Sequence, residues 1–216
     1  MSDEHVISGT ILYGDEPMLI EGYLCVKDGM ITEVGTDPSV DATLDGLVTP
    51  CFVNAHTHAG DSIIKDPPLS DLDSLVRPPD GLKHRVLGES LAIDLTDAMN
   101  RTLNDMIRTG TRAFCDFREG GIAGASMLAD ILATPPYSSA GLEGVIMGRP
   151  HQPDRPGKDE LDDLVEVCNG IGMSGVNDVP FEVLQVASNV AHRAGKLFAI
   201  HGGEKDMSDI SRSIEL

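Results

Sequence analysis

The chain has few cationic side chains for its size. Lys and Arg together number 16, against 35 Asp and Glu, so the formal net charge is -19. A surface of this charge repels the phosphates of nucleic acids and the anionic headgroups of membranes. We therefore expect neither nucleic acid nor a membrane surface among its partners.

Cysteine is also scarce, and its spacing is uninformative for metal binding. The four residues Cys25, Cys51, Cys115 and Cys168 form no Cys-x-x-Cys pair. The sequence shows no signal-peptide pattern and no apolar run of membrane-spanning length. We expect reduced thiols that pack in the interior, and a cytoplasmic protein.

The 216 residues contain enough apolar side chains to form a core without disulfide or metal staples. Hydrophobic residues make up 41% of the chain, too many for a disordered acidic segment. The acidic residues are spread from Asp3 to Glu215. A folded protein with such a surface repels itself, and concentrated salt screens this repulsion. We therefore expect a halophilic protein.

Residues 1–46 contain short β-like runs separated by turn signals, and Lys27-Asp28-Gly29-Met30 is typical of a tight hairpin. A few such strands cannot cover both of their own faces. We expect this segment to be the N-terminal part of a small β-sandwich domain, completed by strands from elsewhere.

From residue 47 to 216, apolar strand-like runs alternate with helix-like stretches, a pattern that predicts a parallel sheet in an α/β fold. Asp94 or Thr96 is the expected N-cap of the first long helix, and Gly110 its C-terminal stop. The expected strands are 47–53, 113–117, 144–148, 171–176 and 197–200. A closed barrel of eight such units takes about 250 residues. The chain is therefore either a compact five-stranded domain or the first five strands of a partial TIM-type β/α barrel.

His56-Thr57-His58 directly follows the first of these strands. Alternate residues of an extended chain point the same way, so two imidazoles about 7 Å apart along the strand can close on one ion. Histidine pairs of this kind also occur on surfaces without a metal, and the pair alone is weak evidence.

The wider sequence is more specific. Residues 48–61 read Val-Thr-Pro-Cys-Phe-Val-Asn-Ala-His-Thr-His-Ala-Gly-Asp. This string resembles the metal-binding signature of the amidohydrolase superfamily, in the branch of cytosine and guanine deaminases and chlorohydrolases. Cys51 stands where that family usually has Gly, and a side chain this small is expected to pack there. The Gly-x-Ile-x-x-Val-Gly phrase at 29–35 is similar to the end of the family's N-terminal β segment.

A second phrase, His201-Gly202-Gly203-Glu204, follows the fifth strand and is similar to the family's His-x-x-Glu. The resemblance implies that His56, His58 and His201 bind one divalent ion, with zinc favoured and iron as the alternative. It also implies that Glu204 is the catalytic proton shuttle. Without the resemblance, His201 reads as a hydrogen-bonded histidine at a strand end and Glu204 as a solvated carboxylate.

The resemblance implies a metal-dependent hydrolase, most simply one that deaminates a nucleobase-like heterocycle. Hydrolysis of an amide or a C–Cl bond on the same site stays open, and so does a non-catalytic remnant that acts as a subunit. The family's site also uses a His after strand six and an Asp after strand eight. We expect those strands to lie in missing sequence or in a partner or second copy, and the 216 residues alone to be weak or inactive.

Five further residues are candidates for contact with the heterocyclic substrate. They follow expected strand ends or lie in the long connection after the first strand: Lys83, His84, Arg118, Glu119 and Arg149. Long loops on a rigid barrel often set specificity, and Arg is a planar, permanently charged donor. The alternatives are a mobile surface insertion for the loop, and salt bridges for the charged residues.

The acidic composition predicts that salt stabilises the fold. The melting temperature should rise between low and molar KCl, because screening shortens the range of repulsion to about 3 Å at molar ionic strength. Thermal unfolding followed by circular dichroism measures the shift. A melting temperature that stays constant or falls would contradict the halophilic interpretation.

Overall fold

The computed structural model of the chain describes residues 4–37, 39–77, 80–157, 159–203 and 207–216. It divides into two compact units, Met1–Cys51 and Phe52–Leu216. The sequence places the domain boundary after residue 46. In the structure this position falls inside a strand, Leu44–Val48, which pairs with the first strand of the N-terminal unit.

The N-terminal unit is a four-stranded sheet in the order β3-β2-β1-β4. Its strands are β1 (Glu4–Tyr13), β2 (Met18–Lys27), β3 (Met30–Gly35) and β4 (Leu44–Val48). The expected hairpin at 27–30 is confirmed and joins β2 to β3. Asp28 and Gly29 have φ values of 51° and 79°, the left-handed pair that a two-residue type I′ turn requires.

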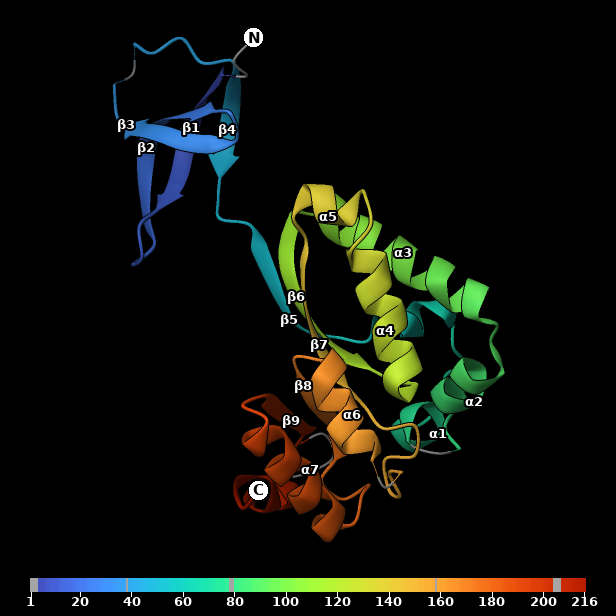
Figure 1. The fold of residues 1–216 in the computed structure, drawn as a ribbon. Coiled ribbons are helices and arrows are strands. Elements are labelled where there is room, and N and C mark those ends of the chain that lie inside the picture. Colours follow the sequence, from blue (N-terminus) through green and yellow to red (C-terminus); the bar gives the residue numbers. More distant parts are fainter. Residues whose placement is uncertain (1–3, 38, 78–79, 158, 204–206) are drawn as a thin grey trace. The chain divides into compact units, whose positions relative to one another are not determined.

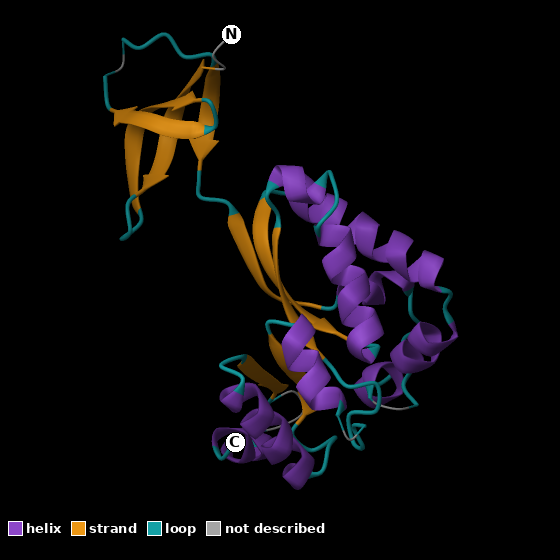
Figure 2. Cartoon of the chain, in the orientation of Figure 1, coloured by secondary structure: helices purple, strands orange, loops and turns teal. Residues whose placement is uncertain are grey.

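The second unit is built on a five-stranded parallel sheet whose strands follow one another in chain order; the strands are labelled in Figure 1 and drawn in orange in Figure 2. Its strands are β5 (Phe52–Thr57), β6 (Thr111–Arg118), β7 (Glu143–Gly148), β8 (Gly170–Gly175) and β9 (Leu197–His201). The sheet curls, which confirms the prediction of an α/β fold with a partial TIM-type barrel. In such a sheet, the C-terminal ends of all the strands face the same rim.

Helices follow the strands as the alternation predicts. The longer ones are α3 (Ala92–Arg108), α4 (Gly121–Leu132), α6 (Glu160–Val167) and α7 (Phe181–Arg193). The shorter ones are η1 (Ala59–Ile63), α1 (Leu72–Val76), α2 (Leu82–Glu89), α5 (Tyr137–Ala140) and α8 (Ser208–Ile214). Among the described residues, none of the helices has the length and apolarity to cross a membrane.

Two sequence predictions about element boundaries are wrong. The apolar run 47–53 is divided between two units, because β4 ends at Val48 and β5 begins at Phe52. Pro50 stands between them, and its backbone has no N–H for a sheet ladder. Helix α3 begins at Ala92 with Leu91 as its N-cap, ahead of the expected Asp94 or Thr96, and has no side-chain cap.

The core of the second unit lies between the helices and the sheet. On α3, the apolar side chains of Met99, Leu103 and Met106 are buried at helical spacing, and they pack with Phe114 of β6 and Leu128 of α4. A second cluster joins α6 and α7 to β8. These two hydrophobic clusters lie on the helical side of the sheet. They thus fix the strands whose C-terminal ends form the rim.

Leu103 tests this packing. Leu103→Ala should lower the free energy of unfolding by about 2–5 kcal/mol, because the side chain is fully buried and its removal leaves a cavity. Ile93→Ala on the same helix, where the side chain is 62% exposed, should change it by less than about 0.5 kcal/mol. Urea unfolding followed at 222 nm measures both, since the described helices belong to the second unit. Equal effects of the two variants would contradict the assigned core.

Candidate metal centre

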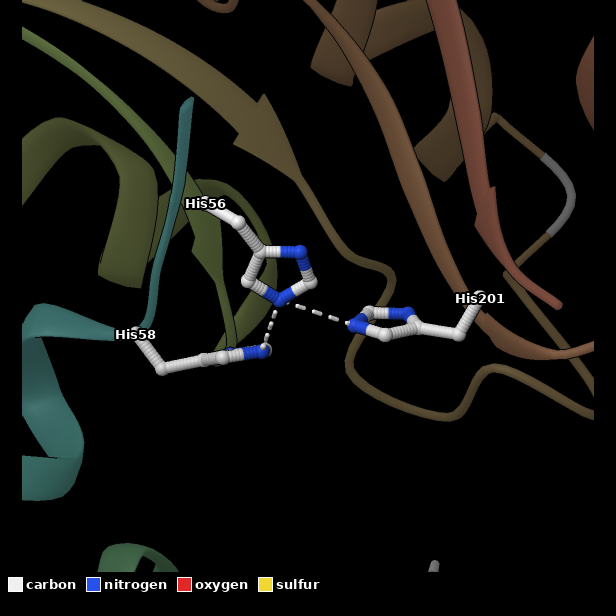
Figure 3. Close-up of side chains that lie close together, drawn as sticks. All are labelled: His56, His58 and His201. Carbon is white, nitrogen blue, oxygen red and sulfur yellow. Dashed lines mark hydrogen bonds between the residues drawn. The ribbon is translucent and has the colours of Figure 1, made fainter. Parts of the chain in front are cut away.

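Three histidines meet at the rim of the second unit. His56 lies in β5, His58 follows that strand, and His201 is the last residue of β9. Strands β5 and β9 are the two edges of the sheet, and the curl of the sheet brings their ends together. His56 Nε2 lies 3.2 Å from His58 Nε2 and 3.1 Å from His201 Nε2 (Figure 3). Residues 145 positions apart in sequence thus share one point.

Backbone carbonyls orient two of these rings. His201 Nδ1 lies 3.0 Å from the Met173 carbonyl oxygen, and His58 Nδ1 lies 3.1 Å from the Phe117 carbonyl oxygen. A carbonyl only accepts hydrogen bonds, so each contact favours the ring form that carries its proton on Nδ1. The Nε2 atoms of His58 and His201 then present lone pairs to the point that they share with His56.

This arrangement fits a metal ion. Lone pairs that face one another at such short distances repel unless a cation or a proton lies between them. Nitrogen ligands about 2.0–2.1 Å from a tetrahedral zinc lie about 3.3 Å from one another, close to the observed spacings. Among the described residues, His56, His58 and His201 form one of two groups whose donor atoms are close enough to hold an ion.

Hydrogen bonds to the Asp116 carboxylate hold the segment that carries His56 and His58. The hydroxyl of Thr57 donates to Asp116 Oδ2 at 2.9 Å, and the backbone N–H of Ala59 donates to the same oxygen. Burial raises the pKa of Asp116, while the charge of Arg118 and these hydrogen bonds oppose the rise. Phe117 lies beneath the cluster, with its ring stacked on His56 at a centroid distance of 4.7 Å.

Thr57 and Phe117 are functional neighbours that the sequence analysis missed. The role of Thr57 could have been inferred from its position. A residue between two histidines that point the same way along an extended chain points to the opposite side. Phe117 gives no such signal, because its contact with His56 depends on how β5 and β6 pair.

A buried ion cluster adjoins His58. Glu119 Oε1 lies 3.0 Å from His58 Nδ1 and 2.6 Å from Lys83 Nζ. Arg118 and Arg149 also donate to Glu119, at 3.0 and 3.2 Å. Burial disfavours the charged carboxylate, but the hydrogen bond from His58 and the charges of Lys83 and Arg118 outweigh it and hold the pKa of Glu119 well below its usual range.

The five residues expected to contact substrate lie around the histidines, though not all face open space. Lys83 and Arg149 line a cavity of about 260 Å³ together with the three histidines. His84, Glu119 and Arg149 line an adjoining cavity of about 590 Å³. Arg118 lines neither of these cavities, and its guanidinium fills the space where a side chain at Gly60 would begin.

The prediction for Arg118 and Glu119 as substrate contacts left an ion pair as the alternative, and the structure shows that pair. His84 Nε2 lies 3.0 Å from the Val76 carbonyl oxygen. Burial, with the charges of Arg149 and Lys83, lowers the pKa of His84. Glu204, the expected proton shuttle, lies outside the described residues.

Comparison with known proteins places this site in a family. Residues 47–215 match the amidohydrolase family. A putative aminohydrolase of Methanothermobacter thermautotrophicus is 35% identical over 224 residues, which cover 97% of this chain and 56% of that protein. The chain spans about half the length of the curated relatives it matches over most of its own length.

Solved structures show the same fold. Guanine deaminase from C. acetobutylicum, solved with guanine in its active site, has a TM-score of 0.66 at 14% identity and covers 99% of this chain and 56% of its own. An atrazine chlorohydrolase from Arthrobacter aurescens, complexed with zinc, has a TM-score of 0.62 at 15% identity, with coverage of 91% and 52%. These likenesses show the fold, and the match over residues 47–215 identifies the chain as a member of the amidohydrolase family.

Proposed function

We propose that the protein is a metal-dependent hydrolase whose single divalent ion is held by His56, His58 and His201. The observation that carries the proposal is that His56 Nε2 lies 3.2 Å from His58 Nε2 and 3.1 Å from His201 Nε2, with the lone pairs of the last two oriented by backbone carbonyls. When bound, such an ion activates water for attack on an electrophilic carbon. Zinc is the favoured ion, because imidazole suits it, and iron is the alternative.

The residues around the ion site have separate tasks in this proposal. Phe117 packs against the rings of His56 and His201 and keeps solvent from that side of the site. Arg149 and Lys83, both buried and both lining the cavity with the histidines, orient the substrate through their N–H groups. Glu204, three positions after His201 in the sequence, is proposed to carry protons between water, substrate and leaving group.

The proposed reaction is hydrolytic deamination of a nucleobase-like heterocycle. It is supported by the relative named a putative aminohydrolase and by the structural likeness to a guanine deaminase. The likeness to a chlorohydrolase favours a second candidate, hydrolysis of a C–Cl bond. The two reactions differ in the leaving group and use the same activated water.

Metal content tests the ion site. The purified chain should bind about one equivalent of zinc, and His201→Ala should lose most of it, because one of three ligands is gone. His192→Ala is the matched control, since this exposed histidine lies on α7, away from the cluster. Mass spectrometry of metals after dialysis against zinc measures the content. Equal zinc in His201→Ala and in the wild type would contradict the site.

Ammonia release tests the reaction. The protein, in the form in which its cell makes it, should release ammonia from at least one member of a panel of aminopurines, aminopyrimidines and pterins. His56→Ala should reduce the rate by at least about a hundredfold, because the ion supplies the activated water. Zinc binding without ammonia release from any member of the panel would contradict the deaminase proposal. Chloride release from a chlorotriazine would then support the second candidate.

A further inference from the structure

We propose that Glu119 is a positioning residue of the metal centre, which fixes the ring of His58 so that Nε2 faces the ion. This inference rests on the proposed function, because it requires an ion at the three histidines. It also gives Glu119 a different task from the substrate contact that the sequence suggests.

The geometry of His58 carries the argument. Its Nε2 faces His56, and its Nδ1 on the other side of the ring lies 3.0 Å from Glu119 Oε1. To bind a metal through Nε2, the ring must carry its proton on Nδ1. A carboxylate accepts that proton's hydrogen bond more strongly than the neutral carbonyl of Phe117 at 3.1 Å. Carboxylates placed in this way fix the ring and raise the basicity of the ligating nitrogen.

Three cations hold the Glu119 carboxylate in place. Arg118 donates to Oε2, while Lys83 and Arg149 approach Oε1. The side chains of Glu119 and Lys83 are only 9% and 7% exposed. These partners come from β6, from α2 in the long connection, and from the residue after β7. The long connection is thereby joined to the metal centre through Lys83.

The contacts of Lys83 differ between the two neutral forms of His58, which carry the ring proton either on Nδ1 or on Nε2. Its ammonium has three N–H groups and lies 2.8 Å from Asp61 Oδ2, 2.6 Å from Glu119 Oε1 and 3.0 Å from His58 Nδ1. It can donate to Nδ1 only when that atom lacks a proton, which is the form whose Nε2 cannot bind a metal. When Nδ1 carries the proton, the ring donates to Glu119 and Lys83 keeps its two carboxylates. Glu119 therefore selects the metal-binding form against the competing lysine.

The test compares Glu119→Gln with Asp61→Asn. Both variants remove one negative charge from beside the same ammonium, but only the first removes the carboxylate that lies 3.0 Å from His58 Nδ1. Zinc affinity is measured by competition with a chromophoric chelator, and ligand geometry by the visible spectrum of the cobalt-loaded protein. Glu119→Gln should weaken zinc binding by about 10–100-fold and alter the cobalt spectrum. Asp61→Asn should stay within about fivefold of the wild type, the effect of a partly exposed ion pair.

Glu119→Gln leaves three cations around a neutral amide, which destabilises the buried cluster. A second variant therefore separates an effect on His58 from a folding defect. Glu119→Asp keeps the charge but withdraws the carboxylate by one methylene, and it should also weaken zinc binding. Circular dichroism verifies the fold of each variant. Zinc affinities of both Glu119 variants within the range of Asp61→Asn, with an unchanged cobalt spectrum, would overturn the inference. A wild-type chain that binds no zinc would overturn the proposed function itself.

Discussion

The metal centre depends on the repulsion between lone pairs of neighbouring imidazole nitrogens, which only a cation or a proton between them relieves. The Nε2 atom of His56 lies 3.2 Å from that of His58 and 3.1 Å from that of His201, and the carbonyls of Phe117 and Met173 orient the lone pairs of the latter two rings toward it. Both carbonyls belong to strands of the same sheet, so the orientation of the rings follows from backbone pairing. The fold thus prepares the site before any ion arrives, which limits the reorganisation that binding requires.

The charges around the site have to accommodate a divalent cation at the three histidines. A divalent cation beside Lys83, Arg118 and Arg149 would meet strong positive repulsion if nothing balanced these residues. Glu119 forms ion pairs with all three, and its carboxylate also lies against His58. Removing one member of such a buried group leaves its partners uncompensated, which costs several kcal/mol. The cluster is thus held together by its own charges, and the histidines adjoin its acidic centre.

The sequence predicted the architecture well because the fold repeats one simple pattern. Alternating apolar runs located β6, β7, β8 and β9 within a few residues, since each strand is an apolar run flanked by turn signals. The prediction from the sequence was wrong at residues 47–53, where one apolar run contributes residues to two sheets. It also failed at the start of α3, because Leu91 caps the helix without any side-chain hydrogen bond.

Only part of the site could be predicted from the sequence. The histidines occur in phrases that resemble a known family, so their meeting could be expected from two short stretches. The role of Glu119 could not, because its neighbours Lys83 and Arg149 are 36 and 30 positions away and their pairing depends on how α2 and β7 pack. Nothing in local spacing distinguishes a substrate-binding arginine from one that holds a buried carboxylate.

X-ray absorption at the zinc edge of the metal-loaded chain tests the central claim most directly. The account predicts a first shell of nitrogen or oxygen ligands at about 2.0–2.1 Å, with the outer-shell scattering of three imidazole rings. A first shell of oxygen ligands without imidazole scattering, or one that contains sulfur from a cysteine, would contradict it.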